Sequence, residues 1–181
     1  CSTSVLAMIN AAVYVDSGKM DTAISSTSSH FCSAEKQFRF PLEYGGQRPP
    51  TAQWTVTGAG AAMISSKNEK NSPKIEKAIL GKMVDKGVKD ASNMGAAMAP
   101  AAADTIAAFL TETQTAPEHY DLILTGDLGK VGSKLLYDLL EKEYNINIRK
   151  VHNDTGLMMY YPDKQDVPAG GSGCGCCGSI L

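Results

Sequence analysis

Tyr120-Asp-Leu-Ile-Leu-Thr-Gly-Asp127 is the stretch that decides the fold class of this sequence. A short apolar run that ends in a Gly-Asp turn signal predicts a buried β-strand followed by a tight turn. Residues 94–110 precede this stretch and are rich in alanine, which predicts a helix with Pro100 early enough to bend it. Residues 131–144 follow it and predict an amphipathic helix, because their leucines share one face. A strand between two helices is typical of an α/β fold.

The first half of the chain also alternates between helix and strand signals. Hydroxyl residues suited to capping open residues 1–18, apolar residues fill them, and Gly18 provides a helix end. This helix is apolar almost all round, so we expect it to be buried. Further strands are predicted for residues 22–27, 55–64, 74–83 and 146–151. A glycine-rich stretch at residues 169–178 is expected to lead into a last helix.

Composition excludes several classes of protein. The 181 residues are 43% hydrophobic and 20% charged, which is typical of a soluble globular protein. The net charge is −2 and no basic block stands out, so a nucleic-acid partner is not expected. No apolar run reaches membrane-spanning length and no secretory signal is visible, so the chain is not expected to be secreted.

The five cysteines do not form a disulfide framework or a metal motif. Three of them crowd the glycine-rich end as Cys174-Gly-Cys-Cys177, without the paired spacing and second cluster that structural zinc sites use. The glycines at residues 58–60 and 170–175 lack the Gly-Lys-Ser/Thr of a phosphate loop. We therefore predict a reducing compartment, no metal and no cofactor.

The two ends of the sequence are unusual for a self-contained domain. The chain opens on a helix expected to be buried and closes at the start of another helix. We therefore expect a fold that is incomplete at both ends.

Three segments, in this order and spacing, resemble the thiolase superfamily. A cysteine opens a buried helix, Thr57-Gly-Ala-Gly-Ala-Ala-Met-Ile64 is similar to the glycine-rich strand of condensing enzymes, and the helix at 94–110 precedes the strand at 120–125. Further strings resemble a sporulation branch of that superfamily: Cys1-Ser-Thr-Ser4, Thr27-Ser-Ser-His30, Arg39-Phe-Pro41, Gln47-Arg-Pro-Pro-Thr-Ala-Gln-Trp-Thr-Val-Thr-Gly-Ala-Gly60, Met98-Ala-Pro-Ala-Ala-Ala-Asp-Thr-Ile106, Thr125-Gly-Asp-Leu-Gly129 and Gly170-Gly-Ser-Gly-Cys-Gly175.

The resemblance implies both a fold and a role. The fold is a thiolase-like layered α/β fold (αβαβα), in which residues 1–84 are the remainder of the first half and residues 85–181 part of the second. The role is binding of dipicolinic acid, with or without calcium, in support of its transport during sporulation. The implied partners are other spore membrane transport proteins. A second copy of the chain, forming a homodimer, is also a possible partner. The implied location is the cytoplasm or the periphery of the spore inner membrane.

Cys1 carries the enzyme alternative. A thiol at a helix N-terminus has a lowered pKa, which suits a nucleophile. In condensing enzymes a histidine and an asparagine assist that cysteine, and the resemblance places them where this sequence has Gly126-Asp127 and Ser172-Gly173. We therefore expect no condensing activity, with an acyltransferase as the first alternative and a scaffold without a ligand as the second. An N-terminal nucleophile hydrolase is disfavoured, because those enzymes begin with a strand.

A flat aromatic dianion needs cations, helix N-terminal N–H groups and an apolar wall. The sequence offers these between the opening helix and residues 30–54, where Phe38 and Trp54 could form the wall. Each arginine there could instead pair with Glu35 or Glu43, and Trp54 could simply pack in the core. The candidate ligand-binding residues are Cys1, Ser2, His30, Arg39, Arg48, Gln53, Asp127 and Ser172.

Overall fold

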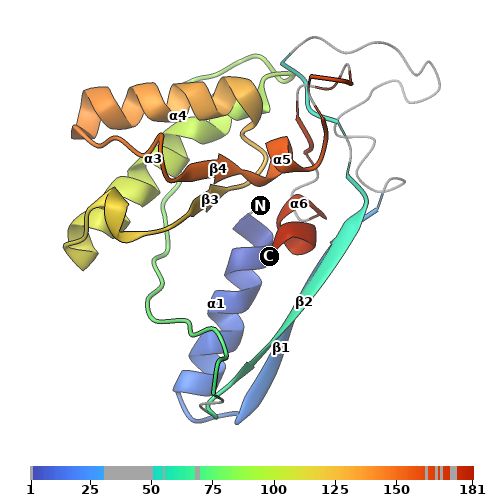
Figure 1. Cartoon of the computed structure of the whole chain (residues 1–181), viewed down its shortest axis with the longest axis vertical. Coiled ribbons are helices and arrows are strands. Elements are labelled where there is room, and N and C mark those ends of the chain that lie inside the picture. Colours follow the sequence, from blue (N-terminus) through green and yellow to red (C-terminus); the bar gives the residue numbers. More distant parts are fainter. Residues whose placement is uncertain are drawn as a thin grey trace.

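The computed structural model describes residues 2–30, 51–54, 56–67, 70–161, 163–165, 167, 169–171 and 175–181. Helices and strands alternate in it, and the strands form small sheets, so the α/β class is confirmed. Two groups of elements lie side by side (Figure 1), and residues 72–92, which contain neither helix nor strand, connect them.

The first group is a helix on a two-stranded sheet. Helix α1 (Ser2–Asp16) ends near Gly18, whose φ of +70° is a conformation that glycine adopts without strain. Strand β1 (Thr22–Ser29) then pairs antiparallel with β2 (Gly58–Ser65) in a register that joins Thr22 to Ser65 and Ser29 to Gly58. The predicted strands at 22–27 and 55–64 are therefore confirmed over most of their length. Figure 1 shows α1 lying along one face of this sheet.

The second group is a parallel strand pair beside two long helices. It contains α3 (Met94–Thr113), the short 3₁₀ helix η2 (Pro117–His119), β3 (Ile123–Thr125), α4 (Gly129–Tyr144), β4 (His152–Asp154) and α5 (Thr155–Met158). The helices predicted at 94–110 and 131–144 are confirmed by α3 and α4. The strand predicted at 120–125 is confirmed for Ile123–Thr125 only, and the prediction that it is buried is wrong, because β3 is half-buried and Leu122 before it is 52% exposed.

The core of the second group lies between α3 and α4. Its most buried members are alanines on α3, leucines on α4 and at its N-cap, and Ile148: Ala99, Ala103, Ala107, Leu128, Leu136, Leu140 and Ile148. The two helices cross closely because Gly95 and Gly132 face each other, and a Cβ built on either glycine would lie within 3.1 Å of the other's backbone. Alanine and glycine on α3 therefore allow the leucines of α4 to fill the interface.

Helix α6 (Gly175–Ile180) joins the two groups. Gly58 and Gly60 of β2 face Gly175 and Gly178 of α6, with room for no side chain between them. Cys177 of the same helix contacts Thr155 of α5. The glycine-rich end of the sequence thus leads into a helix, as expected, and its glycines allow close packing.

Helix α3 satisfies, by length and composition alone, the criteria for a membrane-crossing helix within the described residues. The sequence had indicated no run of that length. Core helices of globular proteins meet the same criteria, and α3 supplies Ala99, Ala103 and Ala107 to the core against α4. Packing against α4 therefore accounts for the apolar residues on this face of α3.

The predictions of a strand at 74–83 and of a strand at 146–151 are wrong. Residues 74–83 form no strand: this segment runs past α3, where Lys82 pairs with Asp104 at 2.9 Å and Gly81 packs on Thr105. Residues 146–151 form no strand either, because Asn145 ends α4 with a φ of +55° and the chain sends Ile148 into the core before β4 begins at His152.

Helix α1 is buried on one face only, contrary to the prediction. Ala11 and Val15 are buried, whereas Val13 is 61% exposed and Leu6 is 48% exposed. The reason is that, within the described part of the chain, α1 packs chiefly against one face of the β1–β2 sheet.

Candidate functional site

The carboxyl ends of β3 and β4 lie at the same edge of their parallel sheet, where α/β proteins commonly bind ligands. Thr125 ends β3 and Asp154 ends β4, and these two residues are partners in the strand register. A loop over residues 126–128 connects β3 to α4, and α5 follows β4 directly. The side chains at this edge therefore determine what the site can do.

The carboxylate of Asp154 is fully buried and holds this edge together. It accepts hydrogen bonds from the Thr125 hydroxyl at 2.9 Å and from the backbone N–H groups of Leu128 and Gly129 at 3.0 and 3.1 Å. It also caps α5 by accepting from the N–H of Leu157 at 3.3 Å. Four donors compensate the cost of burying this charge, and they fix the loop after β3 relative to α5.

Asp127 lies in the loop that Asp154 holds. Its side chain is 3% exposed, and its φ of +62° places it in the left-handed region, which aspartate tolerates better than most residues. The side-chain amide of the buried Gln53 donates to the backbone carbonyl of Asp127. This contact brings together two of the predicted site residues, which lie far apart in the sequence.

Backbone pairing places Gln53 at this position. The N–H of Trp54 donates to the carbonyl of Ala169 at 2.8 Å, and the N–H of Gly171 donates to the carbonyl of Trp54 at 2.8 Å. Gly170 in turn donates to the carbonyl of Gly156 in α5 at 2.8 Å. Residues 53–54, 126–129, 154–156 and 169–171 therefore converge on one region.

His152 lies behind this region with both ring nitrogens near hydroxyl groups. Its Nε2 is 2.8 Å from the hydroxyl of Thr125, and its Nδ1 is 2.8 Å from the hydroxyl of Tyr137. Burial lowers the pKa of His152, and the negative charge of Asp154 partly opposes that shift. The imidazole is thus held neutral between its two partners.

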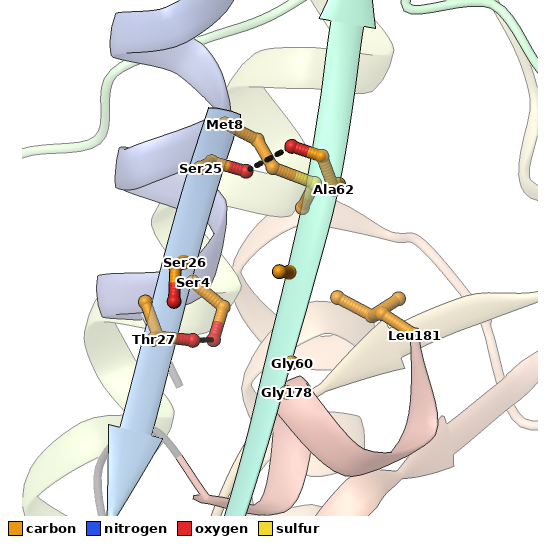
Figure 2. Close-up of a pocket in the computed structure, with 10 residues that line it drawn as sticks. Ser4, Met8, Ser25, Ser26, Thr27, Gly60, Ala62, Gly178 and Leu181 are labelled. Carbon is orange, nitrogen blue, oxygen red and sulfur yellow. Dashed lines mark hydrogen bonds between the residues drawn. The ribbon is translucent and has the colours of Figure 1, made fainter. Parts of the chain in front are cut away.

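A small open hollow lies on the other side of α6, between α1 and the β1–β2 sheet (Figure 2). Its volume is about 150 Å³. The hydroxyls of Ser4 and Thr27 lie 2.8 Å apart, and the Ser25 hydroxyl donates to the carbonyl of Ala62 at 3.4 Å. Met8 and Leu181 add apolar surface. Because these hydroxyls bond to neighbouring groups, the hollow offers mainly a small, uncharged wall.

The cysteines of α6 are not activated nucleophiles. Cys176 is fully buried, and Cys177 lies with its sulfur 3.6 Å from the Thr155 hydroxyl. Burial raises the pKa of the Cys177 thiol, so the thiol form dominates at neutral pH. Over the described ranges, no cluster of three or more His, Cys, Asp or Glu side chains is arranged to hold a metal ion.

The structure brings some of the predicted site residues together and leaves others apart. Gln53 and Asp127 lie together at the edge of the β3–β4 sheet, as described above. His30 follows the end of β1 and is exposed, close to the point where Gly58 packs on α6, and Ser2 is the first residue of α1. Trp54 is half-buried and pairs through its backbone. The remaining predicted residues lie outside the described residues: Cys1, Phe38, Arg39, Arg48 and Ser172.

Sequence analysis missed the hydrogen-bonded residues that hold the loop carrying Asp127, namely Thr125, Tyr137, His152 and Asp154. One signal was available for Asp154. An aspartate followed by Thr-Gly-Leu after a strand is a typical helix N-cap. Because the strand was predicted at 146–151, Asp154 did not follow a predicted strand directly, and the capping signal was not recognised. No comparable signal marks Tyr137, because its hydroxyl meets His152 only after α4 packs on the sheet.

Comparison with known proteins gives a consistent result. The profile of the family described as stage V sporulation protein AD matches residues 1–181. A curated relative, stage V sporulation protein AD of Bacillus subtilis (strain 168), is 49% identical over 176 residues. That match covers 97% of this chain and 51% of the relative, so the chain spans about half the length of the relative.

Proposed function

This chain belongs to the stage V sporulation protein AD family, and from that premise we propose that it contributes to a site that binds dipicolinic acid, alone or with calcium. In this proposal the binding supports transport of the acid into or out of the bacterial spore. Family membership supports the role in sporulation. The proposal that the ligand is dipicolinic acid depends on the arrangement of residues at the edge of the β3–β4 sheet.

The contact between Gln53 and Asp127 carries the proposal. It brings one of the segments rich in candidate ligand groups to the carboxyl edge of the β3–β4 sheet, where small molecules commonly bind. The Gln53 side chain is 3% exposed and the Asp127 side chain is 3% exposed, so both are held rigidly. A rigid polar pair beside loop backbone is a suitable support for a small ligand.

Charge favours the calcium complex over the free dianion. Dipicolinate carries two negative charges, and the carboxylates of Asp127 and Asp154 are buried in this region. Like charges repel strongly where water is excluded. Calcium bound to dipicolinate cancels the charge of the ligand, so we expect the complex to bind more tightly than the acid alone.

We propose further that the chain does not catalyse acyl condensation. Asp127 stands where the resemblance to condensing enzymes requires a histidine, and a carboxylate there cannot stabilise a developing negative charge. His152 engages Thr125 and Tyr137. A thioester substrate analogue should therefore leave the full-length protein unlabelled at Cys1, and covalent labelling at Cys1 would revive the acyltransferase alternative.

Calorimetric titration of the full-length protein tests the ligand. We expect heat of binding with dipicolinate, and tighter binding when an equal amount of calcium is present. Isophthalate is the matched control ligand, because it has the same two carboxylates but lacks the ring nitrogen that helps to chelate calcium. No heat at millimolar dipicolinate, with or without calcium, would overturn the proposal.

Variants locate the site on this chain. Gln53→Leu removes the amide that donates to Asp127 while keeping a side chain of similar size. Loss of one buried hydrogen bond from a binding site should weaken dipicolinate binding about tenfold. Asp163→Asn is the matched control, because Asp163 is fully exposed. Equal affinity in both variants would place the ligand elsewhere in the protein.

The partners and location are proposed on the same basis. We propose that the protein works beside other spore membrane transport proteins, in the cytoplasm or at the periphery of the spore inner membrane. Fractionation of spores should recover it with the inner membrane, and a high-salt wash should release it. Recovery only in the secreted fraction would contradict this location.

A further inference from the structure

A hydrogen-bonded chain runs from the surface of α4 to the loop that carries Asp127. It links the hydroxyl of Tyr137 to Nδ1 of His152 at 2.8 Å and Nε2 of His152 to the hydroxyl of Thr125 at 2.8 Å. Thr125 then donates to Asp154 at 2.9 Å. The same carboxylate oxygen of Asp154 accepts from the N–H of Leu128 at 3.0 Å, next to Asp127.

Chemistry fixes the direction of every bond in this chain. An ionised carboxylate only accepts, so the single proton of the Thr125 hydroxyl goes to Asp154. Nε2 of His152 must then donate to the Thr125 oxygen, which leaves Nδ1 without a proton. Nδ1 therefore accepts from the Tyr137 hydroxyl, and one neutral tautomer of His152 satisfies all the groups.

The surroundings of His152 contain charges of both signs. Asp154 lies two residues along on β4 and is the charged group that acts directly on the imidazole. On the α4 side, Tyr137 lies under Arg149, whose guanidinium carbon is 4.7 Å from the ring centroid. Arg149 is neutralised in turn by Glu141 at 3.0 Å and by Asp138 at 3.5 Å.

We propose that His152 is a positioning residue whose protonation state is transmitted through Thr125 and Asp154 to the loop that carries Asp127. A proton added to Nδ1 turns that atom from an acceptor into a donor, so the Tyr137 hydroxyl must rotate away. The positive charge also strengthens the attraction between His152 and Asp154, which competes with the amides of Leu128 and Gly129 for that carboxylate. The loop that carries Asp127 therefore changes conformation where Leu128 and Gly129 are hydrogen-bonded to Asp154.

The consequence for a ligand rests on the proposed function. Protonation of His152 at low pH should change the position of Asp127, and with it the hydrogen bond from Gln53 to the Asp127 carbonyl. Typical couplings between sites are about fivefold or more. We therefore expect dipicolinate affinity to fall by about fivefold as the pH drops through the titration of His152, and His152→Gln to remove this step.

The main experiment needs no ligand. In the full-length protein, NMR follows the imidazole signals of His152 and the backbone amides of Leu128 and Gly129 from pH 8 to pH 5. We expect the amides to shift with the same midpoint as His152. His152→Gln should abolish this shared transition, and His119→Gln should leave it intact, because His119 is exposed on η2.

Tyr137→Phe and Thr125→Ser refine the assignment. Tyr137→Phe removes only the hydroxyl that donates to Nδ1, so the midpoint of His152 should move while the fold stays intact. Thr125→Ser keeps the hydroxyl and should preserve the coupling. Amides of Leu128 and Gly129 that do not follow His152 would overturn the inference. A protein that binds no dipicolinate but shows the shared midpoint would refute the proposed function and support the inference.

Discussion

At the scale of single residues, the buried carboxylate of Asp154 connects segments that are separate in the sequence. It accepts hydrogen bonds from Leu128 and Gly129 at the start of α4 and caps α5 at Leu157. A neutral amide in its place offers one acceptor oxygen where the carboxylate offers two. Buried donors that lose their acceptor lower the stability of the folded protein. Replacing the Asp154 carboxylate with an amide should therefore lower the stability markedly.

Asp154→Asn should lower the free energy of unfolding by about 2 to 3 kcal/mol, which is typical of lost hydrogen bonds to a buried charge. Urea denaturation of the full-length protein measures this. Asp121→Asn is the control, because Asp121 is exposed and should change the stability by less than about 0.5 kcal/mol. Equal stability of the two variants would show that the carboxylate is not the anchor described above.

His152 predicts a pH dependence of stability with a definite sign. Burial lowers the pKa of this group in the folded protein below its ordinary value of 6.5. The unfolded chain therefore takes up a proton first as the pH falls, so the free energy of unfolding drops below about pH 6.5 and levels off beneath the folded pKa. Denaturation midpoints between pH 8 and pH 5 should show this loss, and His152→Gln should show less of it than His119→Gln.

Sequence reasoning found some of these residues and missed others for a physical reason. Gln53 and Asp127 were predicted from the resemblance, and the structure brings them into contact. Asp154 and His152 were not predicted, because their importance comes from partners on β3 and α4 that no local pattern reveals. Periodicity reports which face of an element is buried, whereas a buried polar network depends on how the elements meet.

At the scale of elements, α3 and α4 approach each other through Gly95 and Gly132. A Cβ on Gly95 would meet the carbonyl of Leu128 and the backbone of Gly132. Alanine is the better helix former by about 1 kcal/mol. Overpacking against backbone costs about 1 to 3 kcal/mol, and neither backbone can move aside easily.

Gly95→Ala should therefore destabilise the protein by about 1 to 2 kcal/mol, despite the gain in helix propensity. Thermal and urea denaturation both measure the change. Ala97→Ser is the control on the same helix, because Ala97 is exposed and the substitution is small. A stabilised Gly95→Ala variant would show that the two helices have room to separate.

The predicted elements succeeded where an apolar pattern was strong and failed where it was weak. Residues 94–110 and 131–144 carry long periodic patterns, and both are helices. Residues 74–83 alternate only weakly, and Lys82 pairs with Asp104 of α3 where a strand would pair with a neighbouring strand. Residues 146–151 contain the buried Ile148 and the partly buried Ile146, which pack against the helical core. Their apolar pattern cannot be distinguished from that of a short strand by sequence alone.

At the scale of the whole molecule, one face of the β1–β2 sheet is apolar and exposed. Ile24 and Met63 are partners in the strand register, and they are 71% and 70% exposed. The side chains around them on this face are small, including Ala59, Ala61 and Ser26. An exposed apolar face of this kind is prone to association.

The 181-residue chain by itself should therefore self-associate through this face. Ile24→Lys combined with Met63→Glu places opposite charges across the strand pair and should shift the chain toward monomer in sedimentation velocity. Leu122→Lys is the control, because Leu122 is 52% exposed in the other group of elements. The same shift with Leu122→Lys would mean that association is not specific to the sheet.

The exposed connection over residues 72–90 should be cleaved by protease without separating the two groups of elements. It offers several lysines to trypsin, including Lys74, Lys77 and Lys86, outside any helix or strand. Cleavage there should give two fragments visible on a denaturing gel. Under native conditions they should still elute as one particle, because Trp54 stays hydrogen-bonded to Ala169 and Gly171 across the nick, and β2 stays packed on α6.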